Sequence, residues 1–461
     1  MSNQGKLLNT GTRITVIDAL RGFALLGVVL VHMNQHYSNF AWGLTPREPV
    51  LSGLDEFVRW LVSNVLMGRF INIFAFLFGM SFFIQMDRAS QKGVDFRGRF
   101  LWRMVVLFAI GMVGSAFYSG DILSLYAIYG VVLVLMYKWK NWALLLVAIF
   151  LLAGGPKLAI MQYDKLTATE QEQPMPQFNM PRSEEVPARP APESQPATEQ
   201  SEDSATDEAS TQTAVQPNNP PQRGGAPNQQ MGRGGMNMPA SQMERPSFWS
   251  AAKQNLTRGT EGKINYQFRM GNRGYITLAL FILGFIVGRL RFFETAHLRR
   301  RRNYVLLGVF VLSLLAVKWI ITLFPQPQGF MMFAPPTVSS IMRTALGDIS
   351  TVLFSAALTM TFVVLYQLPV VGKCLDVLAP YGRMGLTNYV SQSVVGAILF
   401  AFWAFGATFG GWSATETFLL GLGVYIIQII VSALWLKYFK YGPLEWLWRT
   451  ATYLKLQPIK K

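Results

Sequence analysis

Charged side chains are scarce in this sequence, and their scarcity excludes most soluble folds. Asp, Glu, Lys and Arg make up only 14% of its 461 residues, whereas 51% are hydrophobic. An ordinary soluble domain carries about 25% charged residues. Outside residues 162–270, the hydrophobic residues gather in runs close to the ~20 residues that a transmembrane helix needs. The composition therefore predicts an integral membrane protein.

Cysteine and histidine are also rare. Cys374 is the single cysteine, which excludes an internal disulfide and a cysteine-based metal cluster. His32 and His36 have the spacing of a metal-binding pair, but no third ligand with suitable spacing lies near them. We therefore predict no metal site and no tightly bound cofactor.

Basic residues outnumber acidic ones, and the formal net charge is +16. In a soluble protein this surplus would suggest nucleic-acid binding. Here the basic residues lie in short connectors between apolar runs, such as 97–103 and 299–302. The positive-inside rule produces this distribution, so the predicted partner is the lipid bilayer and not nucleic acid.

Ten apolar segments predict an all-α transmembrane bundle of about ten spans. They are 15–36, 66–86, 102–118, 122–137, 142–161, 274–292, 304–324, 346–368, 386–408 and 415–437. If the helices alternate, every basic connector falls on the cytoplasmic side, and so do both termini. Asp18 and Arg21 interrupt the first segment, and no small-residue cleavage site follows it, so we expect a retained helix and not a signal peptide.

Residues 162–270 have a different composition, rich in Pro, Gln, Glu, Ser, Asn and Gly. Such a segment buries too little apolar surface to offset its ordering entropy. We predict an N-terminal transmembrane half over 1–161, a disordered extracytoplasmic loop over 162–270 and a C-terminal transmembrane half over 271–461. The loop is either a spacer between the halves or a binding site for a partner or the cell wall.

Four ionisable residues share one face of the first apolar segment. At 100° per residue, Asp18, Arg21, His32 and His36 fall within an arc of about 60°. Ionisable groups in a spanning helix cost several kcal/mol unless they face a polar interior. We expect this face to look into the bundle. Two structural alternatives stay open: Asp18 and Arg21 can form an ion pair at the start of the helix, and His32 can be a core histidine that hydrogen-bonds a neighbour.

The spacing of Arg21 and His32 matches a long, thin ligand. Eleven residues of helix correspond to about 17 Å, comparable to an extended pantetheine arm. An arginine near the cytoplasm can hold the phosphates of an acyl-coenzyme A such as acetyl-coenzyme A, while the thioester end reaches His32.

The run Asp18-x-x-Arg21-Gly22 followed by His32 resembles the opening helix of the membrane acyltransferase superfamily. That superfamily includes bacterial O-acyltransferases of envelope polysaccharides and the heparan-α-glucosaminide N-acetyltransferase. A narrower resemblance, to the YeiB-type bacterial inner-membrane family (domain of unknown function 418), is carried by 74–79, 121–127, 382–393 and 442–449. The resemblance covers both helical halves and leaves out only 162–270.

The resemblance implies an acyl transfer, with acyl-coenzyme A as co-substrate and an envelope polysaccharide or lipid as acceptor. His32 would act as general base or form a transient acyl-imidazole. Arg21, with Asp18 and Arg383, would bind the donor. It also implies a place in the bacterial cytoplasmic (inner) membrane.

A second polar group begins the ninth apolar segment. Thr387 with Ser391, and Asn388 with Gln392, are i, i+4 neighbours and form a polar stripe. The stripe either makes hydrogen bonds between helices or contacts a substrate. The same polar cavity is predicted to include His36, Asp121 and Asp348. Glu445 and Arg449 are predicted to form an ion pair on an interfacial helix.

Three functions remain open from the sequence. The first is a membrane acyltransferase that moves an acyl group from a cytoplasmic donor to an extracytoplasmic acceptor. The second is a transporter or flippase in which Asp18, Arg21 and His32 relay protons or substrate. The third is a non-catalytic scaffold whose long loop recruits a partner.

Overall fold

The computed structural model describes residues 14–38, 51–91, 93, 95–168, 246–324 and 337–461. These residues are helical throughout, apart from connectors and one isolated bridge between Phe439 and Lys460. The α-helices are α1 (Thr15–Asn34), α2 (Ser52–Leu61), α3 (Arg69–Ser90), α4 (Arg97–Phe117), α5 (Leu123–Met136), α6 (Asn141–Leu152), α7 (Gly155–Ala168), α8 (Phe248–Gln254), α9 (Thr260–Ile264), α10 (Arg273–Arg289), α11 (Arg300–Thr322), α12 (Val338–Tyr366), α13 (Pro369–Leu375), α14 (Leu378–Arg383), α15 (Gly385–Phe400), α16 (Gly406–Phe409), α17 (Ala414–Tyr438) and α18 (Pro443–Tyr453). Short 3-10 and π-helical turns join several of them.

The protein is an all-helical, multi-span membrane protein. Among the described residues, six helices are long and apolar enough to cross a membrane, or up to eight if each of two bent pairs is one span. The bent pairs are α6 with the first part of α7, and the helical segment 248–269 with α10.

Each of the ten predicted segments overlaps at least one helix, but two of these segments hold helices too short to count as candidate spans. α5 has 14 residues and α15 has 16, which at 1.5 Å per residue is shorter than a hydrocarbon core of ~30 Å. Both helices bury much of their surface against neighbours. Hydropathy alone predicts where a helix forms, but it overestimates the lengths of α5 and α15.

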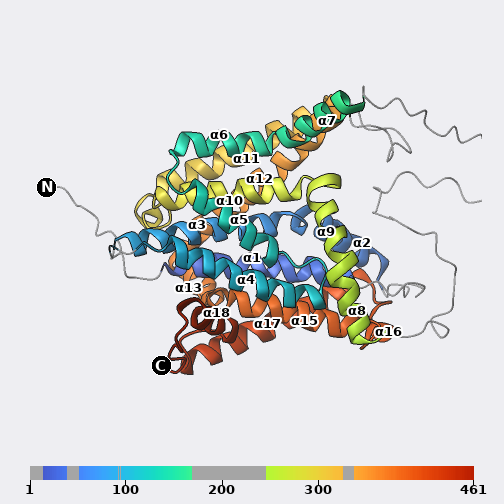
Figure 1. Ribbon diagram of the computed structural model, residues 1–461, viewed down its shortest axis with the longest axis vertical. Coiled ribbons are helices and arrows are strands. Elements are labelled where there is room, and N and C mark those ends of the chain that lie inside the picture. The colour runs from blue at the N-terminus through green and yellow to red at the C-terminus, as the bar shows by residue number, and fades with distance from the viewer. Residues whose placement is uncertain (1–13, 39–50, 92, 94, 169–245, 325–336) are drawn as a thin grey trace, which may run out of the picture. The chain divides into compact units, whose positions relative to one another are not determined.

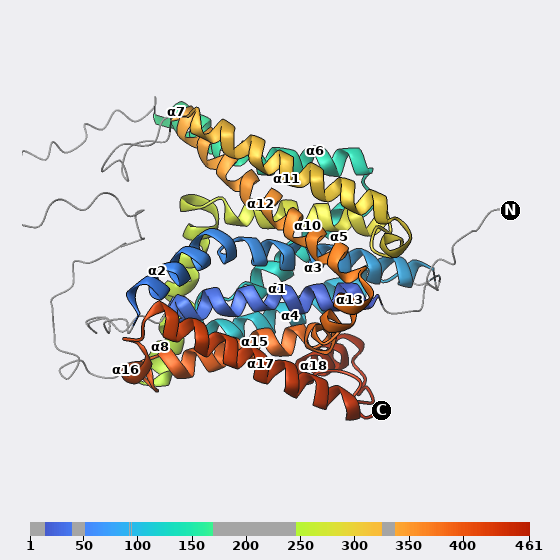
Figure 2. The same ribbon diagram turned by 180° about the vertical axis from the view of Figure 1, so that it is seen from behind.

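α1 lies inside the bundle and packs against α3, α14, α15 and α17 (Figure 1). Most of its buried side chains are small or aliphatic, such as Leu20, Ala24 and Leu25, and Asp18 is the buried ionisable residue of this helix. α6 and α11 lie at the outside (Figures 1 and 2), and large apolar side chains such as Leu146 and Leu312 are exposed there. Apolar residues on an outer face are expected where the surrounding solvent is lipid.

The connectors form two groups, one at each end of the bundle. At one end Arg291 pairs with Asp87 at 3.0 Å, and the Arg289 Nη1 donates to Asn141 Oδ1 at 2.9 Å. At the other end the Thr415 amide donates to Asp55 Oδ1 at 2.9 Å. α13 and α18 lie at the first end, and α2, α8, α9 and α16 at the second (Figures 1 and 2). The first end carries the connectors predicted to be cytoplasmic, and their orientation in the membrane stays a prediction.

Both ends of the predicted loop 162–270 differ from the prediction. Residues 248–270, predicted as disordered, form α8, α9 and two π-helical turns, and α7 continues to Ala168. Asn255 Nδ2 donates to Ala116 O at 3.0 Å, and the ring of Phe248 packs against that of Phe117. These tertiary contacts order a polar segment whose composition alone does not favour structure. The remaining loop residues, 169–245, lie outside the described residues, and the division at 161 and 271 stays a prediction.

Candidate functional site

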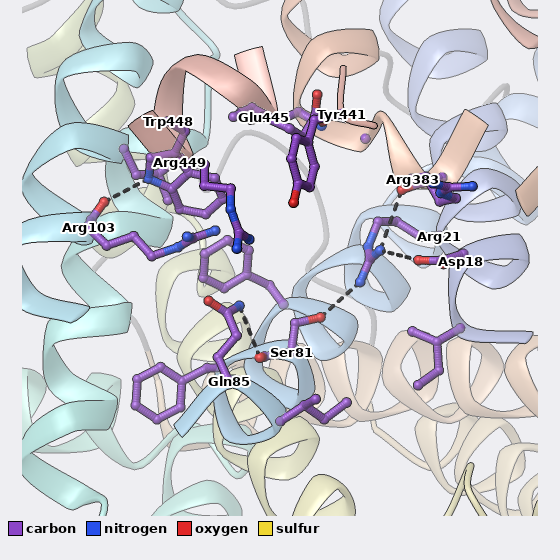
Figure 3. A pocket seen from close by; sticks show the side chains of 18 of the residues that line it. Asp18, Arg21, Ser81, Gln85, Arg103, Arg383, Tyr441, Glu445, Trp448 and Arg449 are labelled. Atoms are coloured by element: carbon purple, nitrogen blue, oxygen red, sulfur yellow. Dashed lines mark hydrogen bonds and ion pairs between the residues drawn. The ribbon is translucent and has the colours of Figure 1, made fainter. Parts of the chain in front are cut away.

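A cavity of about 350 Å³ opens near the end of the bundle that carries α13 and α18 (Figure 3). α1, α3, α4 and α18 line it, together with the junction of α14 and α15. Six of its lining side chains are cationic, and two are acidic, Asp18 and Glu445. The cationic ones are Arg21, Arg88, Arg103, Arg383, Lys440 and Arg449. The excess of positive charge suits an anionic ligand.

The cavity extends along the bundle from charged to apolar surroundings. Arg88 lies near the end of α3, whereas Phe74 lies fourteen residues earlier, about 21 Å along that helix. Phe78, Phe82 and Phe100 add aromatic surface between them, and Leu123, the first residue of α5, lines the cavity as well. A long ligand with an anionic head and an apolar arm fits this gradient.

Arg21 is held on one side of the cavity. Its guanidinium pairs with Asp18 Oδ1 at 3.0 Å, donates to Ser81 Oγ at 2.9 Å and reaches Gly382 O at 3.4 Å (Figure 3). The close approach of α14 to α1 depends on Gly382, because a Cβ there would lie 1.8 Å from Asp18 O. The structure thus brings together Asp18, Arg21 and Arg383, the three residues predicted to bind the donor.

The carboxylate of Glu445 accepts hydrogen bonds from the start of α15. Its Oε1 accepts hydrogen bonds from the amides of Leu386 at 2.7 Å and Thr387 at 3.1 Å, and the Thr387 hydroxyl donates to its Oε2. A carboxylate is favourable at a helix N-terminus. Removal from water raises the pKa of Glu445, and the hydrogen bonds from Thr387 oppose that shift. The predicted Glu445–Arg449 ion pair was wrong, because Arg449 instead stacks on Tyr441 and Tyr453.

His32 lies away from the lining of the cavity, near the far end of α1. Its ring is 5.2 Å from the ring of Tyr37 and 5.1 Å from that of Tyr118, and the side chain is only partly buried. The prediction that His36 shares its helical face was wrong. α1 ends at Asn34, and His36 has a φ of 50°, which turns its ring against Phe400.

Asp121 lies between the surroundings of His32 and the apolar end of the cavity. The turn before it begins at Tyr118, whose carbonyl accepts from the Asp121 amide at 3.0 Å. The Asp121 side chain is fully buried. Its Oδ2 accepts from the amide of Leu123 at 3.0 Å, while no hydrogen bond to Oδ1 meets the geometric criteria among the described residues. Lys263 Nζ, from α9, donates to the Asp121 carbonyl at 2.8 Å. Asp121 therefore lies between Tyr118, which contacts His32, and Leu123, which lines the cavity.

The polar stripe of α15 makes contacts between helices. Asn388 Nδ2 donates to Tyr381 O at 3.0 Å and to Ser432 Oγ at 2.9 Å, and Ser391 Oγ accepts from Gln428 Nε2 at 2.9 Å. Gln392 bonds the hydroxyl of Tyr381. Thr387 is the member of the stripe nearest the cavity, through its bond to Glu445.

Asp348 lies in a different part of the bundle. Its Oδ2 accepts from Asn272 Nδ2 at 3.1 Å, so it belongs to the packing of α12 against the start of α10. Within the described residues, no three His, Cys, Asp or Glu side chains gather as a metal site would require.

The sequence analysis did not identify Arg103 and Arg449 as candidate site residues. Each follows a tryptophan, in the dipeptides Trp102-Arg103 and Trp448-Arg449. The Trp102 indole donates to Ala451 O at 2.9 Å, and the Trp448 indole donates to Arg103 O at 2.9 Å. The repeated dipeptide was the available signal, but nothing in the sequence indicates that α4 and α18 pack together.

The helical bundle, with six to eight candidate spans among the described residues, is that of a multi-span membrane protein, and the cavity at one end of it is lined by an excess of cationic side chains. Residues 13–170 match the family model described as heparan-alpha-glucosaminide N-acetyltransferase, catalytic, and residues 287–455 match the one described as protein of unknown function (DUF418). The chain is therefore similar to a membrane acyltransferase-like family over its N-terminal part and to the DUF418 family over much of its C-terminal part, the two families that the sequence resembles.

Three bacterial relatives are similar to this chain. An uncharacterized 39.9 kDa protein of Bacillus acidopullulyticus is 25% identical over 97% of this chain and 96% of its own length. The uncharacterized protein YxaH of Bacillus subtilis is 26% identical over 98% of this chain and 97% of its own length. The uncharacterized protein YeiB of Escherichia coli is 38% identical over 80 residues, which are 17% of this chain and 20% of that protein.

Proposed function

We propose that the protein is an acyltransferase of the bacterial cytoplasmic membrane, which moves an acyl group from a cytoplasmic acyl-coenzyme A-type donor to an extracytoplasmic acceptor. The observation that supports this most is the cavity, which begins among six cationic side chains and extends past four phenylalanines to Leu123. Phosphates would bind at the cationic end, and the pantetheine arm and thioester would follow the apolar part. The match of residues 13–170 to an acetyltransferase catalytic family supports the same reaction.

His32 would carry the chemistry at the other end of α1. As general base, it takes the proton from an acceptor hydroxyl or amine while the oxygen or nitrogen bonds to the thioester carbon. The carbon–sulfur bond breaks, and the thiolate leaves and is protonated to free coenzyme A. If His32 instead forms an acyl-imidazole, the same bonds change in two steps. In either case the thioester has to pass beyond Leu123 toward Tyr118, so a movement of these side chains accompanies transfer.

Binding of the donor tests this proposal directly. Purified full-length protein in an uncharged detergent should bind acetyl-coenzyme A, and Arg21→Ala should weaken that binding because Arg21 lines the cavity. Incubation with radiolabelled acetyl-coenzyme A and envelope extract should then yield a labelled covalent product. Absence of donor binding by the wild-type protein would favour the transporter hypothesis. A transporter moves its substrate without a covalent product and depends on the proton gradient.

A further inference from the structure

The cationic residues of the cavity differ in how their charge is compensated. On one side, the Arg21 guanidinium is neutralised by Asp18 and also bonds Ser81 and Gly382. On the other side, Figure 3 shows the side chains of Arg103 and Arg449 extending toward one another from α4 and α18. The two guanidinium groups lie close enough to repel each other.

Aromatic rings hold both guanidinium groups in place. The Cζ of Arg103 lies 3.6 Å from the ring centroid of Trp448, and the Cζ of Arg449 lies 5.1 Å from that of Tyr441. A stacked ring attracts the cation and covers the flat face of a guanidinium. The N–H groups stay directed outward along the edge, in the fork that matches two oxygens of a phosphate.

These N–H groups are not used by the protein. Within the described residues, neither guanidinium donates a hydrogen bond or forms an ion pair, and the Nε of each is buried without an acceptor. Glu445, the nearby carboxylate of α18, is engaged by the amides of α15. Two repelling, half-buried cations with unused donors are costly unless an anion compensates them.

We propose that Arg103 and Arg449 form a phosphate clamp, which binds a phosphate ester dianion or a pyrophosphate group in the cavity. The identification of this group with the phosphates of the acyl donor rests on the proposed function, while the clamp itself does not. Arg21, whose donors are already bonded, is a positioning residue that joins α1 to α3 and α14.

Binding of three phosphate compounds tests the clamp without any catalysis. Inorganic pyrophosphate, coenzyme A and dephospho-coenzyme A are titrated calorimetrically into the full-length protein in an uncharged detergent. Arg103→Gln and Arg449→Gln should each weaken pyrophosphate binding at least tenfold. The matched control is Arg97→Gln on the same helix, where Arg97 is exposed and paired with Asp95; its affinity should stay within twofold of the wild type. Pyrophosphate binding that is equal in all four proteins overturns the clamp.

Two further comparisons remove the remaining ambiguities. Arg449→Lys keeps the positive charge but loses the forked pair of N–H donors, so this variant should fold and bind pyrophosphate severalfold more weakly. If the Gln variants do not fold, wild-type affinity of Arg449→Lys for pyrophosphate contradicts the clamp. Micelles that contain phosphatidic acid test whether the phosphate belongs to a lipid. If phosphatidic acid binds in a way that depends on these arginines and coenzyme A does not bind, the phosphate clamp is supported and the proposed acyl-coenzyme A donor is contradicted. Arginine-dependent binding of coenzyme A supports both.

Discussion

His32 is the residue on which the proposed chemistry depends. It lies near the end of α1 opposite Arg21 and packs against Tyr37 and Tyr118, with part of its surface accessible. His32→Ala should lower the rate of acyl transfer by about 100-fold or more, the usual contribution of a general base or nucleophile. The measurement is the initial rate with radiolabelled acetyl-coenzyme A, with the amount of protein in the membrane as control. An unchanged rate at equal protein level removes His32 from the mechanism.

Gly382 is the residue that allows α14 to contact α1. A methyl group there would lie 1.8 Å from the carbonyl oxygen of Asp18, so Gly382→Ala must push the two helices apart. We expect at least tenfold weaker binding of coenzyme A and a loss of stability of about 1–3 kcal/mol, typical of overpacking. Gly423→Ala is the control, because a methyl group at Gly423 meets open space. Equal binding and equal thermal stability in the two variants would show that this contact is not needed.

At the scale of helices, α3 and α10 form a close crossing. A Cβ at Gly79 would lie 2.1 Å from Phe281 O, and one at Gly284 would lie 2.0 Å from Phe76 O. Each helix therefore places a glycine against the backbone of the other, as small residues do where membrane helices approach closely. Gly284→Ala should lower the melting temperature of the detergent-solubilised protein. Gly308→Ala, on the outward-facing α11, should leave it unchanged or raise it slightly because alanine favours helix.

Helix positions were predictable because transfer into lipid depends on local sequence, and each of the ten apolar segments contains a helix. Helix length was less predictable for α5 and α15, which are surrounded by other helices and need not match the hydrocarbon core alone. The helices within residues 248–270 were missed because tertiary contacts order them, such as those of Asn255 with Ala116 and of Lys263 with Asp121. Long-range contacts of this kind leave no local periodicity.

The candidate site was predictable where its residues share one helix. Asp18 and Arg21 are three positions apart on α1, so their pairing follows from helix geometry. Arg103 and Arg449 are 346 positions apart, and only the packing of α4 on α18 brings them together. Glu445 was misassigned for a related reason, since its partners are the amides of α15 and not the arginine one turn along its own helix.

At the scale of the whole molecule, the long loop separates the enzyme hypothesis from the scaffold hypothesis. The Bacillus acidopullulyticus relative has a mass of 39.9 kDa and matches 97% of this chain, whose mass is 51.7 kDa. A similar protein is therefore considerably smaller. Deletion of residues 175–240 should leave acyl transfer within about threefold of the wild type. Loss of acyl transfer in this variant at an unchanged membrane level would contradict the prediction and favour the scaffold hypothesis.

Orientation in the membrane decides from which side the donor enters, and the single cysteine can report it. Cys374 is exposed in α13, at the end of the bundle that carries the cavity. If this end is cytoplasmic, a membrane-impermeant maleimide should leave Cys374 unlabelled in intact spheroplasts and label it in inside-out vesicles. Cys374→Ser combined with Thr408→Cys, in the exposed part of α16 at the opposite end, should give the reverse pattern. Labelling of Cys374 in spheroplasts would place the cationic cavity outside the cell, where coenzyme A thioesters are not supplied, and would contradict the proposed donor even if His32 proved essential.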